Sequence, residues 1–273
     1  MGELRAALAI ARKDIRNVSR YRFQVAASIF TPLYQGVLPG LLFGASFAVG
    51  GRVVGLDKTI GTADLAGFIF MGGVISALVA TAFWVMAMSF RNEMEMGTLE
   101  PTWLTPTARE TLVIGRALGG LFWFAFGQIV IFIVGIAFFG LRIRPETALA
   151  IPAILIAVVA MVGVAYLIAG VVLSIRDANL FVDCTNFLFS VASGAAFPIL
   201  LLPGVLQPIA FALPTTYAMD ILRQQALGTR PLFAPALEYL ALIGGTVVLF
   251  PIGLWAYRRA ERRIRRLGTI NQY

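Results

Sequence analysis

The sequence contains no histidine, very little lysine and a single cysteine, Cys184. Without histidine, the chain cannot use imidazole for acid–base catalysis or as a metal ligand. One cysteine excludes an internal disulfide and a cysteine-based metal cluster. Because these are the side chains on which many enzyme sites depend, we expect no catalytic residue, no metal and no cofactor bound by this chain.

A phosphate-binding loop and membrane-buried charge are missing as well. No stretch follows the pattern G-x-x-x-x-G-K-[ST], and the only lysines are Lys13 and Lys58, so the chain cannot bind ATP through a P-loop. Charged residues make up 13% of the sequence, against about 25% in soluble domains. The long apolar segments hold almost no ionisable residue, which argues against an ion-coupled transporter. Energy for active transport would therefore come from a partner.

What the sequence does contain is apolar residues, which form 59% of the 273 positions and give a mean hydropathy of +0.85. This composition predicts an all-α integral membrane protein, built as one transmembrane domain over residues 1–273. Six apolar stretches can cross a bilayer, since about 20 residues suffice. They cover residues 23–51, 65–90, 112–141, 147–175, 180–202 and 235–257.

Residues 184–219 form an uncharged stretch that is too long for one crossing and too short for two. Its second half is interrupted by Pro198, Pro203, Pro208 and Pro214. We therefore expect residues 203–232 to form re-entrant helices on the extracytoplasmic side. Such a segment requires other protein to cover its polar backbone groups.

Residues 1–22 predict an amphipathic helix that lies in the membrane interface. Apolar residues recur at helical spacing, at Leu4, Leu8, Ala11, Ile15 and Val18, and basic residues occupy much of the remaining surface. This pattern is typical of helices that lie along a membrane. Membrane anchoring is favoured over a regulatory or partner-binding role, and charges within the stretch exclude a cleavable signal.

The distribution of basic residues predicts the orientation. If both termini are cytoplasmic, most of the 22 Lys and Arg residues fall on the inside, including those of the basic tail, residues 258–273. The outside then holds Arg52, Lys58, Arg142, Arg144, Arg223 and Arg230. The positive-inside rule favours this arrangement, in a multi-pass protein of the cell inner or plasma membrane.

Residues 91–116 form the most densely charged interior segment, between two apolar stretches. Gly97 and Thr98 predict a turn that leads into a short helix, which Pro106 ends. Thr107 and Glu110 then have the spacing of a capping box for the next helix. The short helix carries Trp103 and Leu104, two apolar side chains available to dock on a partner.

Several weak motifs in this order resemble the ABC-2 family, the membrane subunits of ABC exporters. The first cytoplasmic loop reads Glu93-x-Glu95-x-Gly97-Thr98-Leu99-Glu100 through Thr105-Pro106. Arg176-Asp177 opens the fifth helix, Ser193-Gly194 lies within it, and Leu213-Pro214-Thr215-Thr216-Tyr217 precedes Asp220 and Arg223. The resemblance covers nearly the whole chain.

The resemblance implies a dimer with a second copy or a homologous permease, carrying two cytoplasmic P-loop ATPases that bind ATP and Mg. It makes the first loop the coupling helix that contacts the ATPase. The coupling residues would be Glu93, Glu95, Gly97, Thr98, Leu99, Glu100, Trp103 and Leu104. It also implies a substrate path at the dimer interface, lined mainly by the first, second and fifth helices.

Glycines and aromatic residues provide candidates for that interface and path. Gly36, Gly40 and Gly44 form overlapping GxxxG steps that let another helix approach closely, either within the subunit or across a dimer. Ser190 and Gly194 would pack in the fifth helix. Tyr34, Trp84, Phe187 and Phe197 are candidate path residues, although aromatic residues in membrane helices often serve packing alone. The presumed path helices hold almost no charge, which favours a hydrophobic or amphipathic substrate; a drug, a lipid, a lipid-linked glycan and a peptide are the open alternatives.

Two other classes of function remain as alternatives. A secondary transporter would show inverted repeats with discontinuous helices in both halves, whereas only the C-terminal half is broken by prolines. A membrane-embedded lipid-modifying enzyme would need clustered carboxylates, histidines or a metal, and the only carboxylate cluster is Glu93, Glu95 and Glu100. Asp183, near the start of the fifth helix, is interpreted as an interfacial carboxylate. No nucleic-acid partner is expected.

Overall fold

The computed structural model describes residues 2–33, 37–38, 48–49, 52–53, 61–62, 64–89, 91, 93, 97, 108–173, 175, 178–195 and 197–267. Helices form most of this part of the chain, as the composition predicts. The exception is a short antiparallel pair, β1 (Ala48–Val49) and β2 (Arg52–Val53), in which Ala48 lies opposite Val53.

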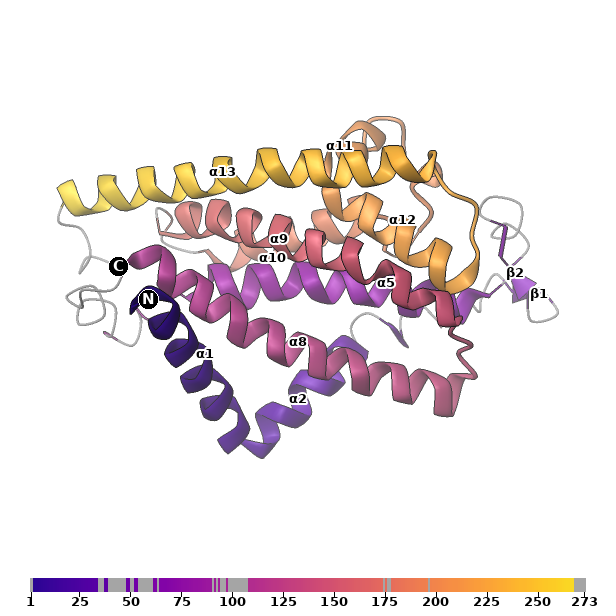
Figure 1. Ribbon diagram of the computed structural model, residues 1–273, viewed down its shortest axis with the longest axis horizontal. Helices are drawn as coiled ribbons and strands as arrows, with labels where there is room; N and C mark the ends of the chain where they lie inside the picture. Colours follow the sequence, from indigo (N-terminus) through magenta and orange to yellow (C-terminus); the bar gives the residue numbers. More distant parts are fainter. Residues whose placement is uncertain are drawn as a thin grey trace.

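Four helical segments run side by side as the body of the molecule (Figure 1). They are α5 (Leu65–Ala80) continued by the π-helix η2 (Thr81–Ala87), α8 (Arg109–Phe139), the 3-10 turn η3 (Pro145–Ala150) continued by α9 (Ile151–Val172), and α13 (Pro235–Leu267). Within the described residues, these four are long and apolar enough to cross a membrane. They correspond to the second, third, fourth and sixth predicted stretches.

The first predicted stretch is only partly described. It begins with α2 (Arg22–Pro32), and the glycines at 36, 40 and 44 lie outside the described residues. The prediction that they form a close-packing face therefore stays a prediction.

The fifth predicted stretch differs from the expectation. The prediction of a continuous helix over residues 180–202 is wrong, because α10 (Asn179–Ala192) ends at Ala192. Gly194 adopts a left-handed φ of +77°, and the chain then turns into η4 (Ile199–Leu201). At 14 residues, α10 is shorter than the ~20 that a bilayer crossing requires. An unbroken apolar run did not guarantee an unbroken helix.

Residues 203–232 contain two short helices, α11 (Gln207–Ala212) and α12 (Pro214–Leu227). Each has proline in its first turn, where the missing N–H has no helical partner to lose. α12 packs against α5, η3, α9 and α13 and is buried over much of its length. It lies at the end of the bundle where α13 begins (Figure 1).

Helices α9 and α13 approach each other closely. A Cβ atom placed on Gly253 would lie 1.9 Å from the carbonyl oxygen of Gly163, so the two backbones touch directly. The outer faces of α8 and α13 are apolar and exposed, as Phe122, Ile133 and Val247 illustrate. Such surfaces suit lipid or a partner helix.

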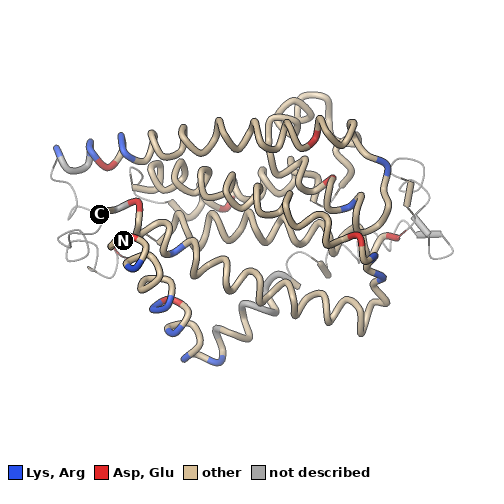
Figure 2. Tube along the Cα trace, in the orientation of Figure 1, with Lys and Arg blue, Asp and Glu red and all other residues tan. Residues whose placement is uncertain are grey.

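Helix α1 (Gly2–Arg20) forms where the amphipathic pattern predicts it. It makes a V with α2 and packs along the first turns of α8 (Figure 1). Basic residues lie along α1 and in the last turns of α13, at the end of the bundle where α8 begins (Figure 2). We call this region the basic end, and the opposite region, formed by η3, α12 and the first turn of α13, the far end.

Candidate coupling site and helix break

The start of α8 is held by a residue that lies far away in the sequence. The cap position is Ala108, whose side chain cannot accept a hydrogen bond. Instead, the Glu3 carboxylate accepts from the Ala108 amide at 3.2 Å and from the Thr111 hydroxyl. A carboxylate here also opposes the positive end of the helix dipole. α8 therefore begins at Arg109, and α1 supplies an acceptor at its start. Thr107 of the predicted capping box lies outside the described residues.

Two turns further, α1 and α8 pack backbone to backbone. A Cβ atom on Gly115 would lie 2.7 Å from Cβ of Ile10, and one on Gly119 would lie 3.2 Å from Cβ of Asp14. Gly115 and Gly119 thus form a GxxxG step that lets α1 approach closely. GxxxG steps were predicted only in the first apolar stretch, and this one was not predicted.

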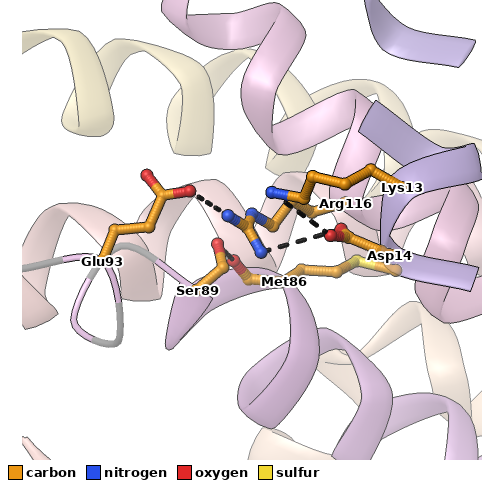
Figure 3. A network of polar contacts seen from close by, with 6 residues as sticks. All are labelled: Lys13, Asp14, Met86, Ser89, Glu93 and Arg116. Carbon is orange, nitrogen blue, oxygen red and sulfur yellow. Dashed lines mark hydrogen bonds and ion pairs between the residues drawn. The ribbon is translucent and has the colours of Figure 1, made fainter. Parts of the chain in front are cut away.

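Arg116 lies between those glycines and joins α1 to the charged loop that precedes α8, through Glu93 (Figure 3). Its guanidinium lies 3.6 Å from Asp14 of α1 and forms a hydrogen-bonded ion pair with Glu93 of the loop. The Glu93 side chain is only 10% exposed, so the pair is largely shielded from water. A single cation therefore bridges three parts of the chain.

The other face of this region contacts α9 and α13. The Tyr166 hydroxyl donates to the carbonyl oxygen of Glu110 at 2.9 Å, and Arg258 donates to the Glu110 carboxylate at 2.8 Å. The first turns of α8 therefore contact α1, the loop, α9 and α13 together. A force applied to the loop has direct contacts through which to reach each of them. We call this the α8 junction.

Only two of the predicted coupling residues are described. Glu93 is buried and paired inside the chain with Arg116, and Gly97 has a left-handed φ of +65°, which suits the predicted turn. The remaining predicted coupling residues lie outside the described part of the chain: Glu95, Thr98, Leu99, Glu100, Trp103 and Leu104.

The break after α10 is a defined structure. The Gly194 amide donates to the Val191 carbonyl at 3.0 Å and the Ala195 amide to the Ser190 carbonyl at 3.3 Å. This pair of bonds around a left-handed glycine is a Schellman motif. The carbonyls of Gly194 and Ala195 then point onward, beyond the helix.

Arg223 of α12 donates hydrogen bonds to those carbonyls. Its guanidinium donates to Gly194 at 2.7 Å, to Ala195 at 2.8 Å and to Phe68 of α5 at 3.2 Å. It also stacks 3.5 Å from the centre of the Phe68 ring, and the residue is only 5% exposed. We call this arrangement the Arg223 clamp; it joins α12, α5 and the end of α10.

Gly72 makes the clamp possible. A Cβ atom at this position would lie 2.0 Å from the Ala195 carbonyl oxygen, so only glycine lets α5 pass so close to the break. Sequence reasoning noted Arg223 as part of a motif but assigned it no contact, because its partners are backbone atoms of distant segments.

Of the predicted packing and path residues that the structure describes, some are packed within the chain and the others are exposed. Ser190 donates to Ser76 of α5 at 2.8 Å, and Gly194 is buried at the break, so both pack within this chain. Phe187, Phe197 and Trp84 are exposed by 67%, 43% and 36%. Tyr34 lies outside the described residues.

Phe187 belongs to a continuous exposed face on α10. The face follows helical spacing and comprises Leu180, Asp183, Cys184, Phe187 and Leu188. Apart from Asp183, in the second turn, it is apolar. Because no other described helix covers this face, it is available to lipid, substrate or a second subunit.

Together, these features define a multi-pass membrane protein whose helices meet at a junction beside a charged loop. Within the described residues, no group of three histidine, cysteine or acidic side chains could hold a metal ion. The class is a transport protein of the membrane, and residues 5–227 match the family model of the ABC-2 type transporter. The chain belongs to this family, and no curated protein matches it.

Membership makes the chain a transport permease and not itself an enzyme. Permeases of this family generally work with a cytoplasmic ATPase subunit and often dimerise. The lack of a P-loop in this sequence agrees with that division of labour.

Proposed function

We propose that this chain is the membrane-spanning subunit of an exporter that moves a hydrophobic or amphipathic molecule out of the cytoplasm. A drug, a lipid or a lipid-linked glycan fits this description. A separate P-loop ATPase supplies the energy. The permease lies in the inner or plasma membrane of the cell, with both termini in the cytoplasm. The observation that carries the proposal is the uncovered apolar face of α10.

That face has the chemistry of a path for an apolar molecule. Phe187, Leu188 and Leu180 are each more than half exposed. They lie on α10, whose C-terminal end is held by the Arg223 clamp. Two such faces, brought together in a dimer, would enclose a passage lined by hydrocarbon. The neighbouring apolar stretches 65–90 and 147–175 carry no charge, which favours an apolar cargo over an ion.

The α8 junction provides a route for coupling. In the proposal, residues 97–105 form a coupling helix that seats Leu99, Trp103 and Leu104 in a cleft of the ATPase. Movement of the loop then reaches α8 through the Glu93–Arg116 pair and the chain connection at Ala108. From the start of α8 it reaches α1, α9 and α13.

The direct test is reconstitution of the permease with its ATPase in lipid vesicles. We expect ATP-dependent movement of an apolar or lipid-like probe, and none when the ATPase carries a substituted P-loop lysine. The permease alone should hydrolyse no ATP. Transport driven by an ion gradient without ATP would favour the secondary-transporter alternative and overturn the proposal.

The coupling role of Trp103 has its own test. Aromatic anchors at interfaces typically contribute at least ~2 kcal/mol of binding, so Trp103→Ala should reduce recovery of the ATPase in a pull-down while membrane insertion stays intact. Glu95→Gln, at the rim of the same loop, should have a smaller and more salt-dependent effect. Equal recovery with equal coupled ATP turnover would show that Trp103 is an ordinary interfacial residue.

The natural cysteine tests the path. If two copies bring their α10 faces together, a short bis-maleimide should join Cys184 to Cys184 of the second copy in membranes. The control places Cys on the exposed face of α8, as Ile133→Cys in a Cys184→Ser background, where no cross-link is expected. Cross-linking through position 133 but not 184 would place the interface on α8.

A further inference from the structure

A groove lies between α9 and α13 at the basic end. Its volume is about 380 Å³. The lining residues are Leu167, Gly170 and Val171 of α9 and Trp255, Ala256, Arg259, Ala260 and Arg263 of α13. None of them is acidic, so the two guanidinium groups are not balanced by a carboxylate within the groove.

Small residues create the floor of this groove. A Cβ atom on Gly170 would lie 3.2 Å from Cα of Tyr257, so the two helix backbones run close together. On the α13 side of the groove, Ala256 and Ala260 have short side chains that leave the space between the helices open. Leu167 and Val171 complete a floor that presents only hydrocarbon.

The groove spans the boundary between apolar and charged sequence. Its deeper part is flanked by Trp255, which is 61% exposed, and tryptophan favours the level of lipid headgroups. Arg259 lies one turn beyond, with its guanidinium carbon 5.6 Å from the centre of the Trp255 ring. Arg263 follows one further turn out, where the apolar span ends.

We propose that this groove is a binding site for an anionic phospholipid. The headgroup phosphate would be held by Arg259 and Arg263, since guanidinium groups bind phosphate oxygens strongly. One acyl chain would lie along the floor beside Leu167 and Val171. Basic pockets between transmembrane helices at the cytoplasmic side are suited to such lipids.

Charge and shape together select this occupant. A soluble phosphate would leave the apolar floor uncovered, and a zwitterionic lipid would bring its own cation toward two arginines. The neighbouring Arg258 differs, because it is engaged with Glu110 at 2.8 Å. The site depends neither on the transported substrate nor on the ATPase.

The test compares two double variants that remove the same charge from the same helix. Arg259→Gln/Arg263→Gln changes the groove, and Arg262→Gln/Arg266→Gln is the control, since both of its positions are exposed and neither lines the groove. The full chain, purified in detergent, is titrated with dioleoyl phosphatidylglycerol or dioleoyl phosphatidylcholine. Native mass spectrometry counts the lipids retained, and thermal unfolding reports the stabilisation they confer.

We expect the groove variant to bind phosphatidylglycerol about tenfold more weakly than the control variant does, from the loss of two phosphate contacts. Phosphatidylcholine should bind weakly to both the groove variant and the control variant. Equal weakening in the two variants would mean diffuse surface charge and would overturn the site. Equal retention of both lipids by the unmodified chain would overturn its preference for anionic lipid.

Two further arms test the apolar half. Ala260→Leu keeps every charge and fills the floor, and it should also lower phosphatidylglycerol retention. Soluble glycerophosphoglycerol, which has the headgroup without acyl chains, should not compete at matched concentrations. Unchanged retention in Ala260→Leu, or full competition by the soluble headgroup, would show a simple anion site and overturn the lipid assignment.

Discussion

The two ends of the bundle hold their helices with opposite kinds of contact. At the α8 junction, cations pair with carboxylates: Arg116 with Asp14 and Glu93, and Arg258 with Glu110. In the Arg223 clamp, one buried guanidinium is held by three neutral carbonyl groups and an aromatic ring. The first arrangement uses side-chain ion pairs, of which Arg258–Glu110 is open to water and Arg116–Glu93 is largely shielded. The second uses fixed backbone atoms.

This difference bears on which end moves. An ion pair near water, such as Arg258–Glu110, exchanges partners at small net cost, because solvent and salt replace the lost contact. A buried cation has no such substitute, and separating it from the clamp would leave the carbonyls of Gly194 and Ala195 without this donor. The α8 junction is therefore the adjustable end, next to the loop, and the Arg223 clamp is the fixed one.

The largest effect should come from removing the clamp. Arg223→Met leaves the carbonyls of Gly194 and Ala195 without their donor in a buried site, and we expect a loss of about 3 kcal/mol or more in unfolding free energy. Reversible unfolding in detergent measures it. Arg230→Met, at an exposed arginine, is the control and should lose less than about 0.5 kcal/mol. Similar losses in both variants would refute the clamp.

The next effect separates two adjacent glycines. Gly72→Ala would force the Ala195 carbonyl away from Arg223, because the new Cβ would lie 2.0 Å from its oxygen. Gly73→Ala meets only a Val37 methyl at 3.4 Å. We expect Gly72→Ala to lower stability by about 1–3 kcal/mol and Gly73→Ala to be near neutral. Two equal melting temperatures would show that the close approach is unimportant.

A double-mutant cycle tests the adjustable end. Arg258→Met and Glu110→Gln, singly and together, should give a coupling energy of about 1 kcal/mol, because this pair is open to water. This coupling should shrink as salt is raised, whereas the effect of Arg223→Met should stay constant. A salt-independent coupling larger than that of the clamp would reverse the assignment of the two ends.

The smallest effect concerns the cap on α8. Glu3→Ala removes the acceptor for the Ala108 amide and should cost about 1 kcal/mol. Glu3→Gln keeps an acceptor and should lose roughly half of that. Hydrogen exchange at residues 108–111 should speed up in the order wild type, Glu3→Gln, Glu3→Ala. Unchanged exchange in both variants would contradict the cap.

Sequence reasoning succeeded where a local pattern determines the structure. The second and fourth predicted stretches form helices over Leu65–Ala87 and Pro145–Val172, because backbone groups in a bilayer must bond within their own segment. It failed at α10, since glycine is tolerated inside membrane helices and Arg223, which donates to the turn, lies 29 residues away. The Glu3 cap, which spans 105 residues, was likewise beyond any local pattern.

The candidate site shows the same limit. The charged loop and its turn at Gly97 were recognisable from composition and spacing. Glu93 was expected to face a partner, yet its carboxylate pairs with Arg116 of the same chain. A lone arginine in the otherwise apolar stretch 112–141 was the available signal for that pair, because a charge at such a position requires a counter-ion.

The docking of α1 on α8 also sets an order of events during synthesis. The end of α1 at Arg20 leaves the ribosome long before Arg109 does, and at ~5–20 residues per second the delay is roughly 5 to 20 s. In that interval α1 has no partner helix. Its docking face is built around two small buried residues, Ala7 and Ala11, beside Ile10 and Asp14, which lie against glycines on α8. Docking of α1 therefore waits until the third long helix of the nascent chain has been inserted.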